Sequence, residues 1–249
     1  MTTALAVIPT YNERATLPEV LTRVLHTPGD LHVLVVDDNS PDGTGEIADE
    51  FAAANDRVHV LHRPGKSGLG PAYRAGLGWG LEQGYDVLIE MDADLSHDPG
   101  HLPELVAATA HADLVLGSRY VPGGGTENWP WHRRALSSGG NRYVRAVTGM
   151  PVRDATSGFR AFRRAVLEEI HLADLASDGY SFQLETVLLA WRAGFEIDEV
   201  PITFVERRAG ASKISRSIIV EALWRVLVWG QRGPRRAGPR HPRSVVAAH

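Results

Sequence analysis

Four carboxylates follow two short apolar runs, and their spacing suits the binding of a divalent cation. Asp92 and Asp94, one residue apart, come after the predicted strand 87–91, and Asp37 and Asp38 come after another such run. Acids at neighbouring strand ends repel one another unless a cation or hydrogen-bond donors compensate their charge. The chain has no cysteine, and oxygen ligands without a sulfur or imidazole partner favour Mg²⁺ or Mn²⁺ over zinc.

Arginines form the second group of side chains that could take part in binding or catalysis. Arg119 follows the predicted strand 114–116, and Arg133 and Arg134 lie in segment 120–134, which is rich in Gly, Trp and Pro and is predicted to be a long loop. Fixed cations stabilise the charge that develops on a departing diphosphate. Guanidinium groups also suit the binding of phosphate groups in general. The alternative is that these arginines are solvated loop charges.

The predicted elements place these side chains together. Short apolar runs alternate with helix-like segments, which predicts an α/β fold with a mostly parallel sheet covered on both faces. Ligands bind at the carboxyl ends of strands in such sheets, and the acids and arginines fall there. The expected strands cover 4–8, 32–36, 58–61, 87–91, 114–116, 158–162 and 197–205, and the expected helices cover 16–26, 42–54, 70–83, 103–110, 135–147 and 181–193.

Composition limits the classes of function. The 249 residues include 26 basic and 30 acidic side chains, and a net charge of −4 argues against a nucleic-acid partner. Without cysteine there is no disulfide or thiol chemistry. No apolar run reaches the ~20 residues that span a bilayer, and the N-terminus lacks the pattern of a signal peptide. We therefore expect a cytoplasmic protein.

The C-terminal region is predicted to differ from the rest of the chain. Segment 216–230 is strongly apolar, and Glu221 and Arg225 are spaced as an i,i+4 pair. A helix from Ser217 to Gly230 reaches only about 21 Å, short of the ~30 Å hydrocarbon core. It is either an interfacial helix on a membrane surface or a core helix, and the sequence leaves both open. Segment 231–249, rich in Arg and Pro, is predicted to be a disordered tail.

Several motifs together resemble a known family. The segments 9–13, 36–44, 91–97, 117–120, 156–160, 179–183 and 207–213 occur in the order found in glycosyltransferase family 2, and the similarity is greatest to its polyprenyl-phosphate (dolichyl-phosphate) mannose synthases. The resemblance covers roughly 4–215. It implies a GT-A-type fold with a single catalytic domain, 1–215.

The resemblance also implies roles for individual residues. A nucleoside would be held by Pro9, Tyr11, Glu13, Val36 and Asp38. The nucleotide diphosphate would be met by Asp92, Ala93, Arg119, Arg207 and Lys213. A metal ion would be bound by Asp94, with Ser96 where some members carry a Gln ligand, and an acceptor phosphate would be bound by Arg119, Arg133 and Ser137. Asp92, Asp94 and Arg119 are thus the expected catalytic residues.

The implied reaction is the inverting, Mg²⁺- or Mn²⁺-dependent transfer of mannose from GDP-mannose to a polyprenyl phosphate at the cytoplasmic face of a membrane. The resemblance also implies that the protein associates peripherally with the membrane, and an integral-membrane partner protein is compatible with this location. One alternative keeps the chemistry but takes a UDP-sugar such as UDP-glucose as donor. Another is an inactive scaffold subunit tethered to a membrane partner, against which the intact Asp92 and Asp94 argue.

Overall fold

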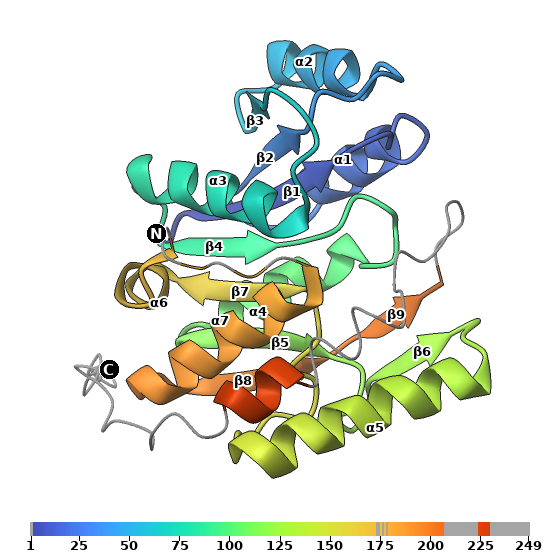
Figure 1. Cartoon of the computed structure of the whole chain (residues 1–249). Coiled ribbons are helices and arrows are strands. Elements are labelled where there is room, and N and C mark those ends of the chain that lie inside the picture. Colours follow the sequence, from blue (N-terminus) through green and yellow to red (C-terminus); the bar gives the residue numbers. More distant parts are fainter. Residues whose placement is uncertain (1, 173–174, 176, 178, 207–223, 230–249) are drawn as a thin grey trace, which may run out of the picture.

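A computed structural model describes residues 2–172, 175, 177, 179–206 and 224–229, and a central sheet organises the chain (Figure 1). The strands run in the spatial order β3-β2-β1-β4-β7-β5-β8. Their bounds are β1 Ala4–Thr10, β2 Leu31–Asp37, β3 Val58–His62, β4 Val87–Glu90, β5 Leu114–Ser118, β7 Arg160–Arg163 and β8 Ile197–Pro201. Only β7 among them is antiparallel to its neighbours. The predicted mostly parallel α/β sheet is therefore confirmed.

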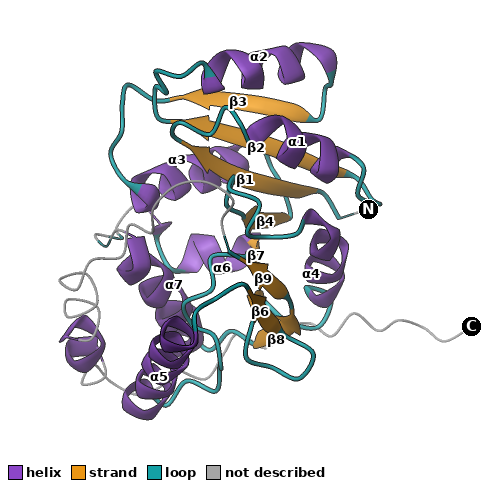
Figure 2. Ribbon diagram, turned by 90° about the vertical axis from the view of Figure 1, so that its right-hand side faces the viewer, coloured by secondary structure: helices purple, strands orange, loops and turns teal. Residues whose placement is uncertain are grey.

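Helices cover both faces of the sheet (Figure 2). One face carries α1 Leu17–Leu25, α2 Thr44–Ala54, the short 3₁₀ helix η1 Pro99–His101 and α4 Leu102–Ala108. The other carries α3 Leu69–Glu82, α6 Arg164–Glu169 and α7 Gly179–Ala193, and α5 Trp131–Thr148 packs beside them through Val144. A separate two-stranded sheet pairs β6 Gly125–Glu127 in parallel with β9 Thr203–Val205.

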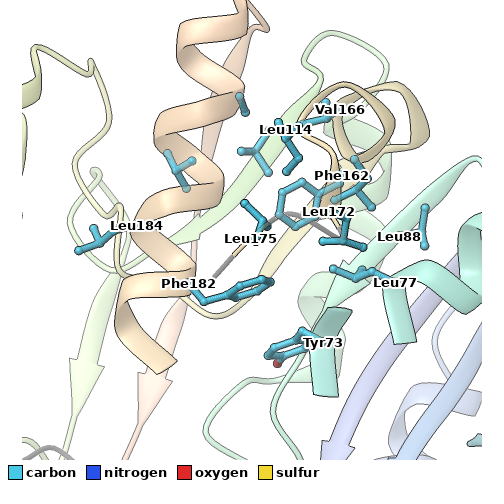
Figure 3. Close-up of a cluster of buried hydrophobic side chains, with 14 of the residues drawn as sticks. Tyr73, Leu77, Leu88, Leu114, Phe162, Val166, Leu172, Leu175, Phe182 and Leu184 are labelled. Atoms are coloured by element: carbon cyan, nitrogen blue, oxygen red, sulfur yellow. The ribbon is translucent and has the colours of Figure 1, made fainter. Parts of the chain in front are cut away.

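Each face of the sheet has its own core. Under α3 and α7 the side chains of Leu77, Leu88 and Phe162 are fully buried, and the rings of Tyr73 and Phe182 stack with centroids 6.3 Å apart (Figure 3). Full burial of such side chains contributes roughly 1.5–3 kcal/mol each. Because Tyr73 also reaches the carboxyl edge of the sheet, this core fixes part of the candidate site described below.

The segment expected to be a loop, 120–134, is partly regular. It contains β6, and α5 begins at Trp131, so Arg133 and Arg134 lie on a helix and the loop prediction is wrong there. β6 pairs with a strand some eighty residues away in sequence, which local periodicity cannot reveal. The start of α5 was missed because its first turn, Trp131–Arg134, buries no side chain and directly follows a stretch rich in Gly and Pro.

Only residues 224–229 of the apolar C-terminal segment are described, and they are helical. Val226 and Trp229 are buried in the core under α7, whereas Trp224 and Leu227 are exposed. One face of this turn therefore belongs to the core. No helix in the described ranges is both long and apolar enough to cross a bilayer. The boundaries predicted at 215/216 and 230/231 lie outside the described residues.

Gly76 lets α3 approach the sheet closely. A Cβ atom on Gly76 would overlap Val7 Cγ1 and lie 2.8 Å from Val36 Cγ2, and both valines are fully buried. Valine is stiff at χ1, so neither side chain can turn away. By contrast, a Cβ atom on Gly78, two residues along the same helix, meets nothing within 4 Å.

We predict that Gly76→Ala lowers the free energy of unfolding by about 1–3 kcal/mol through overpacking. The matched variant Gly78→Ala should raise it by roughly 0.5–1 kcal/mol, because alanine is the better helix former. Chemical denaturation of both variants measures the difference. Equal effects of the two substitutions would contradict the close packing of α3 on β1 and β2.

Candidate active site

The strand directions bring the predicted site residues to one edge. β1, β2, β4 and β5 run the same way, so their carboxyl ends lie together. β7 runs the opposite way, and its first residue, Arg160, therefore also lies at this edge. As a result, the segment before β7, which includes Asp154 and Thr156, joins the cluster formed by the ends of the parallel strands.

Asp92 and Asp94 are each oriented by hydrogen bonds. The Tyr73 hydroxyl donates to Asp92 Oδ1 at 3.1 Å, and the Asp92 backbone N–H donates to His97 Nδ1 at 3.2 Å. Burial, reinforced by the Asp92 charge, raises the pKa of Tyr73 well above its ordinary value, so the hydroxyl stays a donor. Asp94 is nearly buried, and its Oδ1 accepts the backbone N–H of Ser96 at 3.0 Å.

The oxygen atoms of Asp94 and Ser96 are suitable ligands for a divalent cation whose remaining ligands come from a substrate. Ser96 is fully buried, and its hydroxyl oxygen has no hydrogen-bond partner among the described residues. Such an orphaned oxygen beside a carboxylate suits a metal ion or a metal-bound water. No group of three or more His, Cys, Asp or Glu side chains in the described ranges could hold a metal alone. Mg²⁺ and Mn²⁺ commonly complete their shells with substrate phosphates and water.

His97 is not one of these potential metal ligands. It is buried, its ring stacks on Phe159 with centroids 5.0 Å apart, and its edge meets Phe204 at 5.4 Å. Its Nδ1 atom already accepts the hydrogen bond from Asp92. These contacts assign His97 to holding the backbone of the acidic segment in place.

The residues expected to hold a nucleoside gather beside the ends of β1 and β2. Pro9 and Val36 are register partners, and because the Val36 side chain is buried in the core, only its backbone is available for the expected contact. The Asp38 carboxylate accepts from Arg63 Nη1 at 2.7 Å and fixes the segment after β3. Glu13 Oε2 accepts from Thr16 Oγ1 at 3.2 Å.

That fixed segment reaches toward Tyr11. Lys66 Nζ lies 4.0 Å from the centroid of the Tyr11 ring, a cation–π contact. The Ser67 backbone N–H also donates to Asp38 Oδ2 at 3.2 Å. The structure thus places the Lys66 charge next to one of the residues expected to hold the nucleoside.

Arg119 is held in a buried two-point ion pair. Its Nε and Nη2 atoms donate to the two carboxylate oxygens of Asp154 at 2.7 Å each, and Nη2 also donates to Thr156 at 2.9 Å. Asp154 is fully buried. Burial by itself would raise the pKa of this carboxyl, but the Arg119 charge and hydrogen bonds hold it below its ordinary value.

The structure brings Arg119 and Arg133, predicted to bind an acceptor phosphate, to the same indole ring. The Cζ atom of Arg119 lies 5.4 Å from the Trp129 ring centroid, and that of Arg133 lies 4.1 Å from it. Arg133 also forms a short ion pair with Glu206. Ser137 follows Arg133 by one turn of α5, so the three predicted residues share one region.

Asn141 connects α5 to Arg119. Its Nδ2 group donates to the Ser137 carbonyl oxygen at 3.1 Å and to Thr156 Oγ1 at 3.0 Å, and Thr156 in turn accepts from Arg119. Trp129, Asn141 and Glu206 were not predicted as site residues. Their contacts join segments far apart in sequence, and the only local signal was the unusual Trp content of 120–134.

A second buried ion pair lies at the same edge of the sheet. Arg160 and Glu90 are both fully buried, with Arg160 Nε 3.4 Å from Glu90 Oε2. Burial raises the pKa of Glu90 to about 7 in spite of the Arg160 charge. Arg160 also donates to the Gln183 carbonyl oxygen at 2.9 Å, which ties β7 to α7. The predicted residues Arg207 and Lys213 lie outside the described residues.

We predict that Asp154→Asn lowers the free energy of unfolding by about 3 kcal/mol, because it leaves the Arg119 guanidinium buried without its counter-charge. The surface variant Asp56→Asn, at an exposed position, serves as the control and should change it by less than about 0.5 kcal/mol. Denaturant unfolding at neutral pH measures both. If Asp154→Asn lowers the free energy of unfolding no more than the control does, the pair between Arg119 and Asp154 does not stabilise the fold as described.

The same variant has a defined pH dependence. Because the folded pKa of Asp154 lies below its ordinary value of 3.8, the stability it contributes is present above pH 3.8 and is lost as the pH falls through the folded pKa. The stability difference between the native chain and Asp154→Asn should therefore be constant near neutrality and shrink below about pH 4. A difference that grows on acidification would contradict the assignment.

Comparisons with known proteins agree with this geometry. The family model described as glycosyl transferase family 2 matches residues 5–171. The chain is 56% identical to polyprenol monophosphomannose synthase of Mycolicibacterium smegmatis, covering 92% of this chain and 87% of that protein. It is 52% identical to undecaprenyl-phosphate mannosyltransferase of Micrococcus luteus, covering 91% of this chain and 93% of that protein.

A solved structure supports the fold. Glucosyl-3-phosphoglycerate synthase from Mycobacterium tuberculosis, crystallised with Mn²⁺, UDP-glucose and phosphoglyceric acid, superposes with a TM-score of 0.64 over 92% of this chain and 80% of that one. The two are 18% identical, so this likeness concerns the fold, and it confirms the expected GT-A-type architecture. With the family model spanning most of the sheet and both relatives matching over nearly the whole chain, this protein belongs to glycosyl transferase family 2.

Proposed function

We propose that this chain transfers mannose from GDP-mannose to a polyprenyl phosphate and releases polyprenyl-phosphate-mannose and GDP. The observation that carries the proposal is the identity of 52–56% over nearly full length with two proteins named for mannose transfer to polyprenyl phosphates. The geometry supplies a matching chemistry, since acidic residues and two ordered arginines meet at the carboxyl edge of the sheet.

The reaction is a single displacement with inversion. An oxygen of the acceptor phosphate forms a bond to the anomeric carbon of mannose, while the bond from that carbon to the diphosphate oxygen breaks and its electron pair leaves with GDP. A bound Mg²⁺ or Mn²⁺, held by Asp94 and Ser96, would neutralise charge on the leaving diphosphate. Asp92, whose orientation Tyr73 and His97 fix, and Ala93 line the diphosphate side, where Arg207 and Lys213 are also proposed to act.

Arg119 and Arg133 are proposed to position the acceptor. The Asp154 carboxylate holds Arg119 in place, and the Trp129 ring lies against both guanidinium groups. Arg133 is paired with Glu206, so a phosphate dianion would exchange with that carboxylate or share the guanidinium with it. Ser137, one turn further along α5, is the third proposed acceptor contact. No carboxylate base is required, because the phosphate itself is the nucleophile.

The donor nucleoside is proposed to lie beside the ends of β1 and β2, held by Pro9, Tyr11, Glu13, the Val36 backbone and Asp38. A lipid acceptor places the reaction at a membrane surface, and we propose a peripheral association at its cytoplasmic face, where an integral-membrane partner would also be accommodated. The lipid chain would then stay in the bilayer while the phosphate reaches the arginines.

We predict that Asp94→Ala abolishes the formation of lipid-linked mannose from GDP-mannose and a short polyprenyl phosphate, because the metal ion loses its carboxylate ligand. The exposed variant Asp56→Ala should retain full activity, and circular dichroism should show both variants folded. Radiolabelled mannose in the organic phase measures the product. Full activity of folded Asp94→Ala would refute the metal assignment.

We predict that Arg133→Gln raises the KM for the polyprenyl phosphate by about ten- to a hundredfold, because hydrogen bonds to charged groups contribute roughly 1.5–3 kcal/mol. The KM for GDP-mannose should change little. Glu206→Gln removes the competing carboxylate and should lower the KM for the lipid phosphate. Steady-state kinetics with each substrate varied in turn separates these effects, and an unchanged lipid KM in Arg133→Gln would overturn the acceptor role.

A further inference from the structure

A polar cavity lies beside the second half of α5 and adjoins the proposed acceptor residues, since Asn141 in its lining donates to the Ser137 carbonyl oxygen. It has a volume of about 450 Å³ and is lined by Tyr120, Ser138, Asn141, Arg142, Arg145 and Arg153. We call it the α5 basic pocket. Arg119, Arg133 and Ser137 are not part of its lining. Along the helix, Arg145 is twelve residues from Arg133, which is about 18 Å at 1.5 Å per residue.

Three arginines, all exposed, line the pocket. None of the ion pairs among the described residues involves the side chain of Arg142, Arg145 or Arg153. The nearby Glu199 carboxylate is occupied by the backbone N–H groups of Arg153 and Asp154, at 2.7 and 2.9 Å. Guanidinium groups gathered around one hollow attract anions, and their planar donors match phosphate oxygens.

Asn141 offers the ligand a second contact, an unpaired hydrogen-bond acceptor. It is 4% exposed, lines the pocket, and its Oδ1 atom has no hydrogen-bond partner among the described residues. Its Nδ2 group is already used by Ser137 and Thr156. A buried carbonyl oxygen without a donor is costly, so a hydroxyl group of a ligand would be favoured at this point.

We propose that the α5 basic pocket binds a phosphate ester that carries a hydroxyl group near its phosphate, as in a glycerol phosphate group. The arginines hold the phosphate and Asn141 Oδ1 accepts the hydroxyl. This chemistry occurs both in soluble phosphate esters and in the headgroups of anionic membrane lipids. Asn141 also contacts Thr156, which contacts Arg119, so an occupied pocket adjoins the network that holds this arginine. The proposal does not depend on the transfer reaction.

The test measures binding to the full-length chain by calorimetry, with glycerol 3-phosphate as the probe and inorganic phosphate as the comparison. Native protein should bind glycerol 3-phosphate more tightly than inorganic phosphate. Arg145→Gln and Arg142→Gln should each weaken the affinity for glycerol 3-phosphate by about tenfold or more. The control Arg23→Gln removes one exposed charge on α1 and should leave binding unchanged. Failure of native protein to bind, or equal binding by the arginine variants, would overturn the proposal.

A second arm identifies the source of the ligand. Vesicles of phosphatidylglycerol and vesicles of phosphatidylserine, matched in net charge, are compared by cosedimentation. Stronger binding to phosphatidylglycerol that Arg145→Gln removes supports a lipid headgroup, whereas binding of glycerol 3-phosphate alone supports a soluble ester. If inorganic phosphate binds as tightly as glycerol 3-phosphate, the role of Asn141 is overturned. Mannose transfer activity is assayed in the same samples, so its loss or retention is scored separately.

Discussion

The buried pair between Arg119 and Asp154 is the contact on which the rest of the site depends. It joins the end of β5 to the segment that leads into β7, and through Thr156 and Asn141 it reaches α5. A buried ion pair adds little net stability over apolar packing, yet removing one partner is strongly destabilising. The pair therefore fixes the position of a guanidinium group beside Trp129, where the proposed function places the acceptor phosphate.

Two packing features orient the charged groups at this edge of the sheet. Antiparallel β7 delivers its preceding segment to the edge where the parallel strands end, so Asp154 meets Arg119. Close packing of α3 at Gly76 lets Tyr73 bond Asp92 from within the core. The charges at this edge are thus oriented by the protein before any ligand arrives, which is the arrangement expected of a site that stabilises developing charge.

Much of this could be predicted from the sequence. The strands β1, β2, β4 and β5 are short apolar runs that end next to polar residues. The local sequence pattern therefore predicts both the sheet and the edge where the site lies. Local pattern could not reveal β6, whose partner β9 is distant in sequence, nor the amino end of α5, which exposes Trp131. The same limit applies to the pairing of Arg133 with Glu206 and to the α5 basic pocket, since both depend on tertiary contacts.

The identity of the transferred sugar and its acceptor is best tested by giving purified protein a short polyprenyl phosphate, Mg²⁺ or Mn²⁺, and in parallel GDP-mannose, UDP-glucose or UDP-N-acetylglucosamine. Mass spectrometry of the lipid fraction identifies the product. The proposed function predicts lipid-linked mannose from GDP-mannose alone, lost when a chelator is added. A lipid-linked sugar from a UDP donor would contradict the mannose assignment, and no product from any donor would contradict catalysis by this chain.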